Sequence, residues 1–149
     1  MKRKIKILLI NGPNINMLGI REPSIYGNST YQDLLNSIQA FAEQKNIDVV
    51  CKQSNHEGVI VDIIQDAYGV VDGIVINPAA YTHYSIAILD ALKAVGLPAI
   101  EVHISDIKTR ESFRTISYPA MACIEQISGL GFEGYIVALD RLLAYLNEN

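Results

Sequence analysis

The sequence predicts one α/β domain with a doubly wound, five-stranded parallel sheet. Short runs of β-branched residues alternate along the chain with longer segments whose apolar residues have helical spacing. Strands that alternate with helices in this way pair in parallel and carry helices on both faces of the sheet. The chain has 149 residues, half of them apolar, which suits a single domain over residues 1–149 with a substantial core.

Five segments have the composition of buried strands. They are residues 4–10, 48–53, 73–77, 98–103 and 122–127. The first follows a basic start like that of a signal peptide, but its apolar run stops at Gly12-Pro13, so we interpret it as a strand. With helices on both faces, five such strands favour the flavodoxin-like order 2-1-3-4-5.

Four segments have the apolar spacing of helices. They are residues 31–44, 59–68, 85–95 and about 132–146. Ser29 or Thr30 is the expected N-cap of the first helix, with Asp33 in its first turn. Gly69 and Gly96 are the expected C-caps of the second and third helices, because glycine adopts the left-handed conformation that ends many helices.

The charge and the cysteines exclude several classes of protein. Sixteen acidic and twelve basic residues give a net charge of −4, so neither nucleic acid nor an anionic membrane is an expected partner. No apolar stretch approaches the roughly 20 residues that cross a bilayer, and we expect a soluble, cytoplasmic protein. Cys51 and Cys123 lie in apolar runs, which favours buried free thiols over a disulfide. The three histidines lack the spacing of a zinc motif, so no metal is expected.

Polar residues follow the predicted strands at their carboxyl ends. Asn14 comes after the first strand and Asn77 ends the third, while Glu101 and His103 close the fourth. In doubly wound sheets the ligand crevice lies beyond the carboxyl ends of the strands, so these side chains are expected to converge. The long connection before the first helix, at about residues 19–28, is expected to form a lid.

Six groups of motifs in the chain form the pattern of one enzyme family. They are Asn11-Gly12-Pro13-Asn14 with Arg21-Glu22-Pro23 and Tyr26-Gly27, Gln53-Ser54-Asn55, Asn77-Pro78 with Thr82-His83, Glu101-Val102-His103-Ile104-Ser105, Arg110-Glu111 with Phe113-Arg114, and Gly129-Leu130-Gly131 with Gly134-Tyr135. In this order they resemble the type II 3-dehydroquinate dehydratases over nearly the whole chain. The resemblance implies a cofactor-free hydro-lyase that converts 3-dehydroquinate to 3-dehydroshikimate by anti elimination through an enolate, in the shikimate pathway of chorismate and aromatic amino acid biosynthesis.

Dehydration of a β-hydroxy ketone needs a base for the α-proton, stabilisation of the enolate and an acid for the departing hydroxyl. The resemblance implies that Tyr26 is the base. A free phenol with a pKa near 10 is only about 0.1% ionised at neutral pH, and the resemblance supplies Arg21 as the cation that lowers this pKa. Without the motif, Tyr26 would be one of eight tyrosines, most of them structural, and Arg21 a solvated loop charge.

His103 resembles the general acid of the family. Glu101 precedes it by two residues, so both side chains lie on one face of the strand. A carboxylate beside an imidazole fixes the ring and favours its protonated form. The spacing alone is equally consistent with an ion pair without a chemical role.

The resemblance assigns the remaining polar residues to enolate stabilisation and to substrate binding. Asn14 helps to position a water that stabilises the enolate, and Asn77 contacts the substrate, although turns alone often explain asparagine at strand ends. The backbone amides of Ile104 and Ser105, with the Ser105 hydroxyl, bind the substrate carboxylate. Ser105 also suits the N-cap of a following helix.

Three further residues match the family's contacts to the ring hydroxyls. They are His83, Asp90 and Arg114, with Asp90 supplied by a neighbouring subunit. An acid within a helix usually faces solvent, which is the alternative interpretation of Asp90. Arg110 either closes the lid or pairs with an acid at a subunit contact, and the family assembles as a homododecamer, a tetramer of trimers.

The chain departs from the family pattern at Ala79, Thr115 and Glu125, which affects the loop geometry and lid charge more than the chemistry.

Other proteins of this fold bind flavin or accept a phosphoryl group. A flavin carrier needs a Ser/Thr/Gly-rich loop after the first strand, where this chain has Asn11-Gly12-Pro13-Asn14. A receiver domain needs an aspartate where this chain has Asn77. The sequence therefore disfavours both functions. A non-catalytic anion-binding module is the remaining alternative, and the sequence does not distinguish a biosynthetic role from quinate breakdown.

Overall fold

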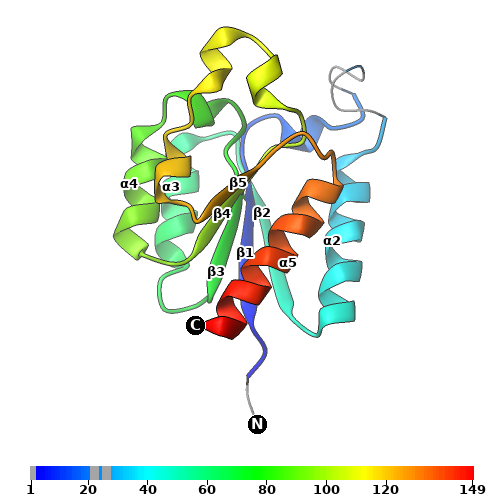
Figure 1. The fold of residues 1–149 in the computed structure, drawn as a ribbon, viewed down its shortest axis with the longest axis vertical. Helices are drawn as coiled ribbons and strands as arrows, with labels where there is room; N and C mark the ends of the chain where they lie inside the picture. Colours follow the sequence, from blue (N-terminus) through cyan, green and yellow to red (C-terminus); the bar gives the residue numbers. More distant parts are fainter. Residues whose placement is uncertain (1–2, 21–23, 25–27) are drawn as a thin grey trace.

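The computed structural model describes residues 3–20, 24 and 28–149 and confirms the predicted sheet. Five parallel strands lie in the order β2-β1-β3-β4-β5 (Figure 1). The strands are β1 (Lys6–Asn11), β2 (Asp48–Gln53), β3 (Gly73–Asn77), β4 (Ala99–Val102) and β5 (Glu125–Ile127). Because all five run in one direction, their carboxyl ends share one edge of the sheet.

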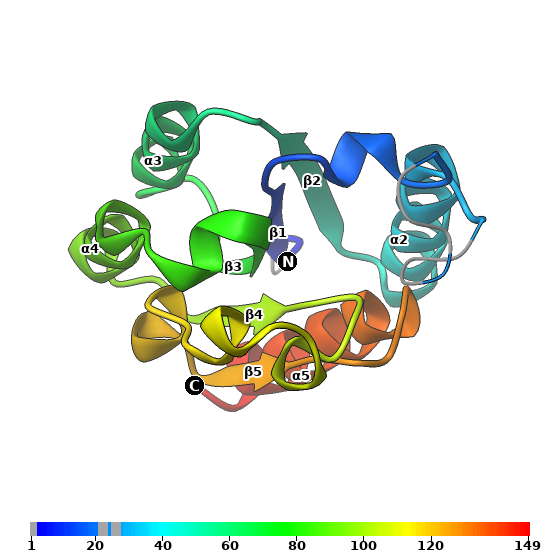
Figure 2. The ribbon, with the colours of Figure 1, turned by 90° about the horizontal axis from the view of Figure 1, so that it is seen from above.

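In the part of the chain that the structure describes, helices cover both faces of the sheet (Figure 2). The helices are α2 (Tyr31–Lys45), α3 (Glu57–Asp66), α4 (Ile86–Val95) and α5 (Glu133–Glu148). Side chains alternate along β1, so that Ile7 and Leu9 pack with α2 and α5, whereas Leu8 and Ile10 pack with α3 and α4. The sheet therefore separates two apolar cores, and its central strands are buried on both faces.

The predicted helix caps are largely confirmed. Thr30 is the N-cap of α2 and forms a reciprocal capping box with Asp33. Gly96 ends α4 with a φ of 65°. The expectation for Gly69 was wrong, because α3 already ends at Asp66 with Ala67 as its C-cap, and Gly69 lies in the following turn with a φ of 76°.

The fifth strand is shorter than predicted. The expected strand began at Ala122, but Pro119–Ala122 forms a 3-10 turn (η5) and pairing starts at Glu125. Ala122 closes this turn and packs against the core beneath α3 and α4, so it does not join the ladder. The apolar run therefore reflects this packing as well as the strand.

Both cysteines are free thiols, as expected, although they are half-buried and not fully buried. Desolvation raises the pKa of the Cys51 thiol to about 11. Desolvation, with a smaller contribution from the negative charge of Glu101, raises the pKa of the Cys123 thiol to about 12. Neither thiol is therefore a thiolate at neutral pH. In the part of the chain that the structure describes, no helix is long and apolar enough to cross a membrane.

Short 3-10 turns lie above the carboxyl edge of the sheet (Figure 1). They are η1 (Ile15–Met17), η2 (Ala79–His83), η3 (Ile107–Thr109) and η4 (Ser112–Thr115). The turns η1, η2 and η3 each follow a strand end within a few residues, and η4 follows η3. They form the walls of the cleft described next.

Candidate active site

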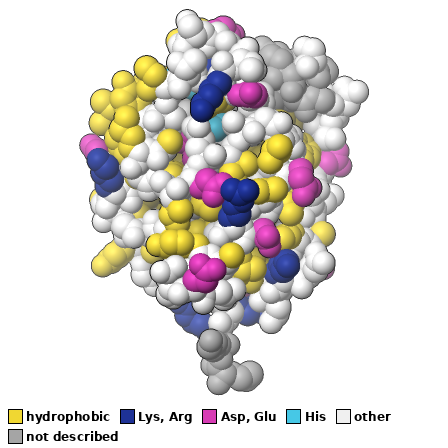
Figure 3. All heavy atoms as spheres, in the orientation of Figure 1, with side chains coloured by type: hydrophobic (Ala, Val, Ile, Leu, Met, Phe, Trp, Pro, Cys, Tyr) yellow, Lys and Arg dark blue, Asp and Glu magenta, His cyan; other side chains and the backbone are white. Residues whose placement is uncertain are grey.

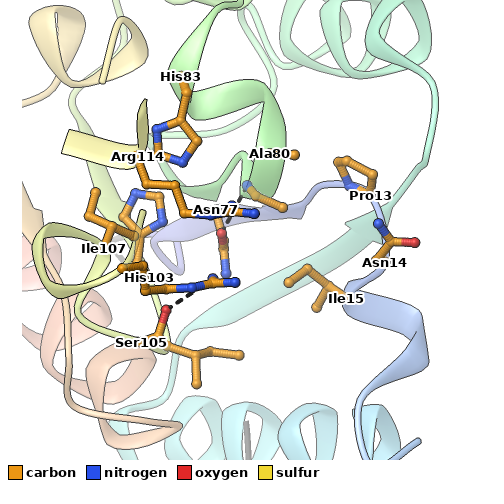
Figure 4. Close-up of a pocket in the computed structure, with 13 residues that line it drawn as sticks. Pro13, Asn14, Ile15, Asn77, Ala80, His83, His103, Ser105, Ile107 and Arg114 are labelled. Atoms are coloured by element: carbon orange, nitrogen blue, oxygen red, sulfur yellow. Dashed lines mark hydrogen bonds between the residues drawn. The ribbon is translucent and has the colours of Figure 1, made fainter. Parts of the chain in front are cut away.

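A cleft lies at the carboxyl ends of β1, β3 and β4 (Figure 4). It is lined by Pro13, Asn14, Ile15, Asn77, Ala79, Ala80, His83, His103, Ile104, Ser105, Ile107, Arg110 and Arg114. Seven of the residues predicted from the sequence therefore come together here. The molecular surface at this end carries a histidine beside basic and acidic side chains (Figure 3).

Of the predicted site residues that the structure describes, Glu101 and Asp90 do not line this cleft. Glu101 lies behind His103, in contact with it. Asp90 lies on the exposed face of α4. Arg21 and Tyr26 fall outside the described residues.

His103 and Glu101 form a buried pair at the end of β4. The distance from His103 Nε2 to Glu101 Oε2 is 2.7 Å, and the two residues are 4% and 0% exposed. The His103 N–H donates to the Ile127 carbonyl at 2.8 Å, which fixes the backbone of this residue against β5. Since the carboxylate occupies Nε2, Nδ1 is the ring nitrogen that His103 can present to the cleft.

The carboxylate of Glu101 also receives two hydrogen bonds that the sequence did not predict. Ser117 Oγ lies 2.8 and 2.9 Å from its two oxygens, and Gln126 Nε2 donates to Oε2 at 2.6 Å. An ionised carboxylate in the interior is costly unless donors replace its water. These contacts satisfy that requirement.

A buried network holds Asn77 at the floor of the cleft. The Asn77 Nδ2 donates to the Tyr135 hydroxyl at 2.8 Å, and that hydroxyl donates to Asn11 Oδ1 at 2.6 Å. Asn77 Oδ1 accepts from the Ala79 N–H at 3.0 Å. Burial raises the pKa of Tyr135, so its hydroxyl stays protonated and can act as donor and acceptor at once. The second N–H of the Asn77 amide is left for the cleft.

Replacing Tyr135 with phenylalanine is expected to lower the free energy of unfolding by about 2–4 kcal/mol. The change leaves a buried N–H of Asn77 and a buried oxygen of Asn11 without partners, and each such group costs about 1–3 kcal/mol. Urea unfolding followed by circular dichroism measures the loss. Tyr145→Phe on the same helix, at an exposed position, is the matched control and should change stability by less than about 0.5 kcal/mol. Equal stability of the two variants would contradict the role of the network.

The turn after β1 is held by two side chains to which the sequence assigned no role. Asn14 has a φ of 70°, which asparagine tolerates better than most residues, and its N–H donates to Asn55 Oδ1 at 3.1 Å. Gln53 Nε2 donates to the same Asn55 oxygen at 3.1 Å and to the Gly12 carbonyl at 3.2 Å. At Gly12 a Cβ would lie 2.5 Å from the Pro78 carbonyl oxygen, so only glycine allows the two turns to meet.

His83 presents an acceptor to the cleft. Its Nδ1 lies 2.8 Å from the Ile116 carbonyl, which can only accept, so Nδ1 carries the proton. Desolvation lowers the pKa of His83, with further contributions from the charges of Arg114 and His103, and the ring is therefore neutral at physiological pH. Its Nε2 is left as an acceptor for a ligand hydroxyl.

Arg114 and Arg110 bring positive charge to the cleft. Arg114 Nε donates to Glu111 at 2.5 Å, and its guanidinium lies 5.1 Å from the centre of the Phe113 ring. Arg110 donates to Ser105 Oγ at 3.5 Å. The sequence gave two alternatives for Arg110, closing the lid or pairing with an acid at a subunit contact. The structure places it in the wall of the cleft.

Ile104 and Ser105 present backbone amides beside these cations. Their carbonyls accept from Gly131 and Gly129, but within the described residues no hydrogen bond engages their N–H groups. The N-cap interpretation of Ser105 was wrong. The following turn is η3, and its N-cap is Asp106, whose side chain accepts from the Lys108 N–H at 3.1 Å.

The three departures from the family pattern have defined surroundings. Thr115 donates to the Ser112 carbonyl at 2.9 Å within η4, and Glu125 pairs with Arg141 of α5. Ala79 has a φ of 53°, in the region where glycine is preferred.

Ala79→Gly is expected to raise the free energy of unfolding by up to about 1 kcal/mol. A left-handed residue with a Cβ costs about 1–2 kcal/mol, from which about 0.5–1 kcal/mol must be subtracted for the greater freedom of glycine in the unfolded chain. Ala80→Gly, in the same turn without a positive φ, has only the second effect and should be destabilising. Chemical denaturation compares the two, and a less stable Ala79→Gly protein would contradict the strain.

The described residues contain no group of three or more His, Cys, Asp or Glu side chains placed to hold a metal ion. The polar side chains that line the cleft are amides, imidazoles, guanidinium groups and one hydroxyl. Such groups donate and accept hydrogen bonds, and an imidazole can also transfer a proton near neutral pH.

Comparisons with known proteins point to one family along nearly the whole chain. The family model of class II dehydroquinases matches residues 5–143. A 3-dehydroquinate dehydratase of Clostridium acetobutylicum is 55% identical over 97% of this chain and 100% of its own length. One from Caldicellulosiruptor bescii is 56% identical over 95% of this chain and 99% of that protein. The crystal structure of a type II dehydroquinase from Butyrivibrio crossotus, 57% identical, superposes with a TM-score of 0.93 over 94% of this chain and 98% of that one. The chain therefore belongs to the class II dehydroquinase family.

Proposed function

We propose that this protein dehydrates 3-dehydroquinate with His103 as general acid and Tyr26 as base. The activity is that of its family: the protein is a 3-dehydroquinate dehydratase, a hydro-lyase of the shikimate pathway. The observation that supports the role of His103 is its burial against Glu101, 2.7 Å away, at the wall of a cleft rich in hydrogen-bond donors. The product is 3-dehydroshikimate.

The elimination requires His103 to give a proton to the leaving hydroxyl. The adjacent carboxylate stabilises the imidazolium form, and Nδ1 is the nitrogen left for the substrate. The α-proton goes to Tyr26, assisted by Arg21. Asn14, in the turn after β1, assists the water that stabilises the enolate oxygen.

The remaining cleft residues bind the substrate. Its carboxylate is expected at the Ile104 and Ser105 amides, where Arg110 adds positive charge, whereas Arg114 is expected at the ring hydroxyls. The Asn77 amide and the Nε2 acceptor of His83 suit the ring hydroxyls.

The activity is tested by mixing the chelator-treated protein with 3-dehydroquinate and following the ultraviolet absorbance of the conjugated enone product. We expect turnover without added metal. A folded protein that binds the anion without forming the enone would favour the non-catalytic anion-binding module instead.

Tyr26→Phe is expected to lower kcat by about 10²–10⁴-fold, because it removes the base while keeping the ring. Binding of a substrate analogue should remain within about threefold of the wild type. Tyr68→Phe, at a position 70% exposed on the surface, is the control and should retain full activity. A Tyr26→Phe protein with near-normal kcat would remove Tyr26 from the role of base.

We further propose a homododecamer, a tetramer of trimers, in which Asp90 completes the site of a neighbouring copy. The exposed position of Asp90 on α4, outside its own cleft, supports this arrangement, as do the exposed apolar side chains of Tyr84 and Ile86 nearby. Sedimentation should give a mass near twelve protomers, and a stable, active monomer would contradict the shared site. The two free thiols are the usual state in a reducing compartment and agree with the cytoplasm as the place of action.

A further inference from the structure

The carboxylate of Glu101 has more hydrogen-bond donors than its pairing with His103 requires. It is 0% exposed and accepts from His103, Ser117 and Gln126, with donor distances between 2.6 and 2.9 Å. The three donors come from different parts of the chain: the end of β4, the loop between η4 and η5, and β5. The proposed function assigns a role to His103 but none to the other two.

The fold directs both extra donors at the carboxylate. Gln126 is the register partner of Glu101 across the parallel pair β4 and β5, so their side chains project from neighbouring positions of the sheet. The Ser117 hydroxyl accepts from the Ala120 N–H at 3.2 Å, which leaves its own proton for Glu101. Each donor is therefore held by the backbone and does not rely on a flexible side chain alone.

These donors influence where the proton of the pair resides. A buried carboxylate next to an imidazolium can remove its charge by taking the proton, which leaves two neutral groups. Hydrogen bonds from Ser117 and Gln126 stabilise the ionised carboxylate and so oppose that transfer. The proton then stays on His103, where the elimination needs it.

We propose that Ser117 and Gln126 are positioning residues that keep Glu101 ionised and aimed at His103, so that the imidazole retains the proton it donates to the leaving hydroxyl. The proposal rests on the proposed function for its effect on turnover, but not for its effect on the protonation of the pair. Ser117 also follows Arg114 by three residues, so the hydrogen bond from Ser117 to Glu101 anchors the η4 segment to the pair of Glu101 and His103, the dyad.

Other titratable groups lie near the pair, and the variants used in the test do not change them. His83 lies close enough to interact by charge with Glu101 and His103, and also with Arg114. Cys123 lies near Glu101, and desolvation raises the pKa of its thiol to about 12, so it adds no charge at neutral pH. None of these three residues is altered in the variants below.

The test compares Ser117→Ala and Gln126→Met, which remove the donors while keeping similar shapes, with the wild type. Each is expected to lower kcat about tenfold with KM within about threefold, because a hydrogen bond to a charged group is lost. The high-pH limb of the kcat profile should move to higher pH, since a carboxylate without these donors is more basic and the pair then holds its shared proton more strongly. Ser117→Thr, which keeps the hydroxyl, should restore kcat and the profile.

Gln39→Met is the matched control for Gln126→Met. Gln39 Nε2 donates to the Val49 carbonyl at 3.0 Å, away from the cleft, and its loss should leave kcat and the pH profile unchanged. Urea unfolding establishes that each variant is folded before its kinetics are read. If the Gln126→Met protein does not fold, the comparison of Ser117→Ala with Ser117→Thr decides the question alone.

Nitrogen NMR of the His103 ring, without substrate, separates this inference from the proposed function. The midpoint of the ring titration should move to higher pH in Ser117→Ala, as the proton of the pair shifts toward Glu101, and return in Ser117→Thr. Variants with wild-type titration and wild-type pH profiles would overturn the inference while the proposed function stands. A shifted titration in a protein that never forms the enone would overturn the proposed function and leave the control of the dyad proton intact.

Discussion

His103→Gln is expected to lower kcat by about 10²–10⁴-fold, the usual contribution of a general acid. Glutamine keeps an amide that can still donate to Glu101, so the buried carboxylate retains a partner and the fold should survive. What is lost is a group that can release a proton to the leaving hydroxyl. The enone assay gives kcat and KM, and KM should change much less than kcat.

His56→Gln provides the control for this change. His56 precedes α3 as its N-cap residue, but its side chain makes no capping hydrogen bond. Its replacement should leave turnover unaltered, because the residue lines no part of the cleft. A His103→Gln enzyme that turns over at a rate near the wild type would rule out His103 as the acid.

Glu101→Gln is expected to lower kcat by a similar factor of about 10²–10⁴ and also to destabilise the fold. An amide cannot stabilise the imidazolium as a carboxylate does, and in a serine protease the loss of such a carboxylate from its histidine costs about 10⁴-fold. The new NH₂ group would also face donors from Ser117 or Gln126, and each unsatisfied group costs about 1–3 kcal/mol.

Two measurements on the Glu101→Gln protein separate these effects. Urea unfolding gives the loss of stability, and the enone assay without urea, at a temperature well below the unfolding transition, gives the loss of kcat. Glu43→Gln on the exposed side of α2 is the control and should change neither quantity appreciably. A destabilised Glu101→Gln protein with undiminished kcat would reduce Glu101 to a structural residue.

The sequence predicted those parts of the fold that depend on local patterns. The strand order follows from the alternation of strands and helices, and the capping box of α2 follows from Thr30 and Asp33, which are three residues apart. The same holds for Glu101 and His103, because residues two positions apart on a strand share a face of the sheet. Local spacing was therefore enough to predict both the architecture and the buried pair of Glu101 and His103.

The contacts that support the site could not be predicted in this way. Ser117 and Gln126 follow Glu101 by 16 and 25 residues, and they meet it only after β5 has paired with β4. Nothing in their own neighbourhood in the sequence marks them. Asp90 is a different case, because its proposed partner lies in another copy of the chain.

The hydrogen bond from the Tyr135 hydroxyl to Asn11 Oδ1 joins residues 124 positions apart in the chain. During synthesis, β1, β3 and their turns leave the ribosome well before α5, so the floor of the cleft lacks its hydroxyl until this late helix docks. Folding that depends on such distant contacts is slow compared with local helix formation. A nascent chain that ends before Tyr135 should therefore carry most of its sheet yet bind no substrate, so that catalytic competence arises in a single late step of folding.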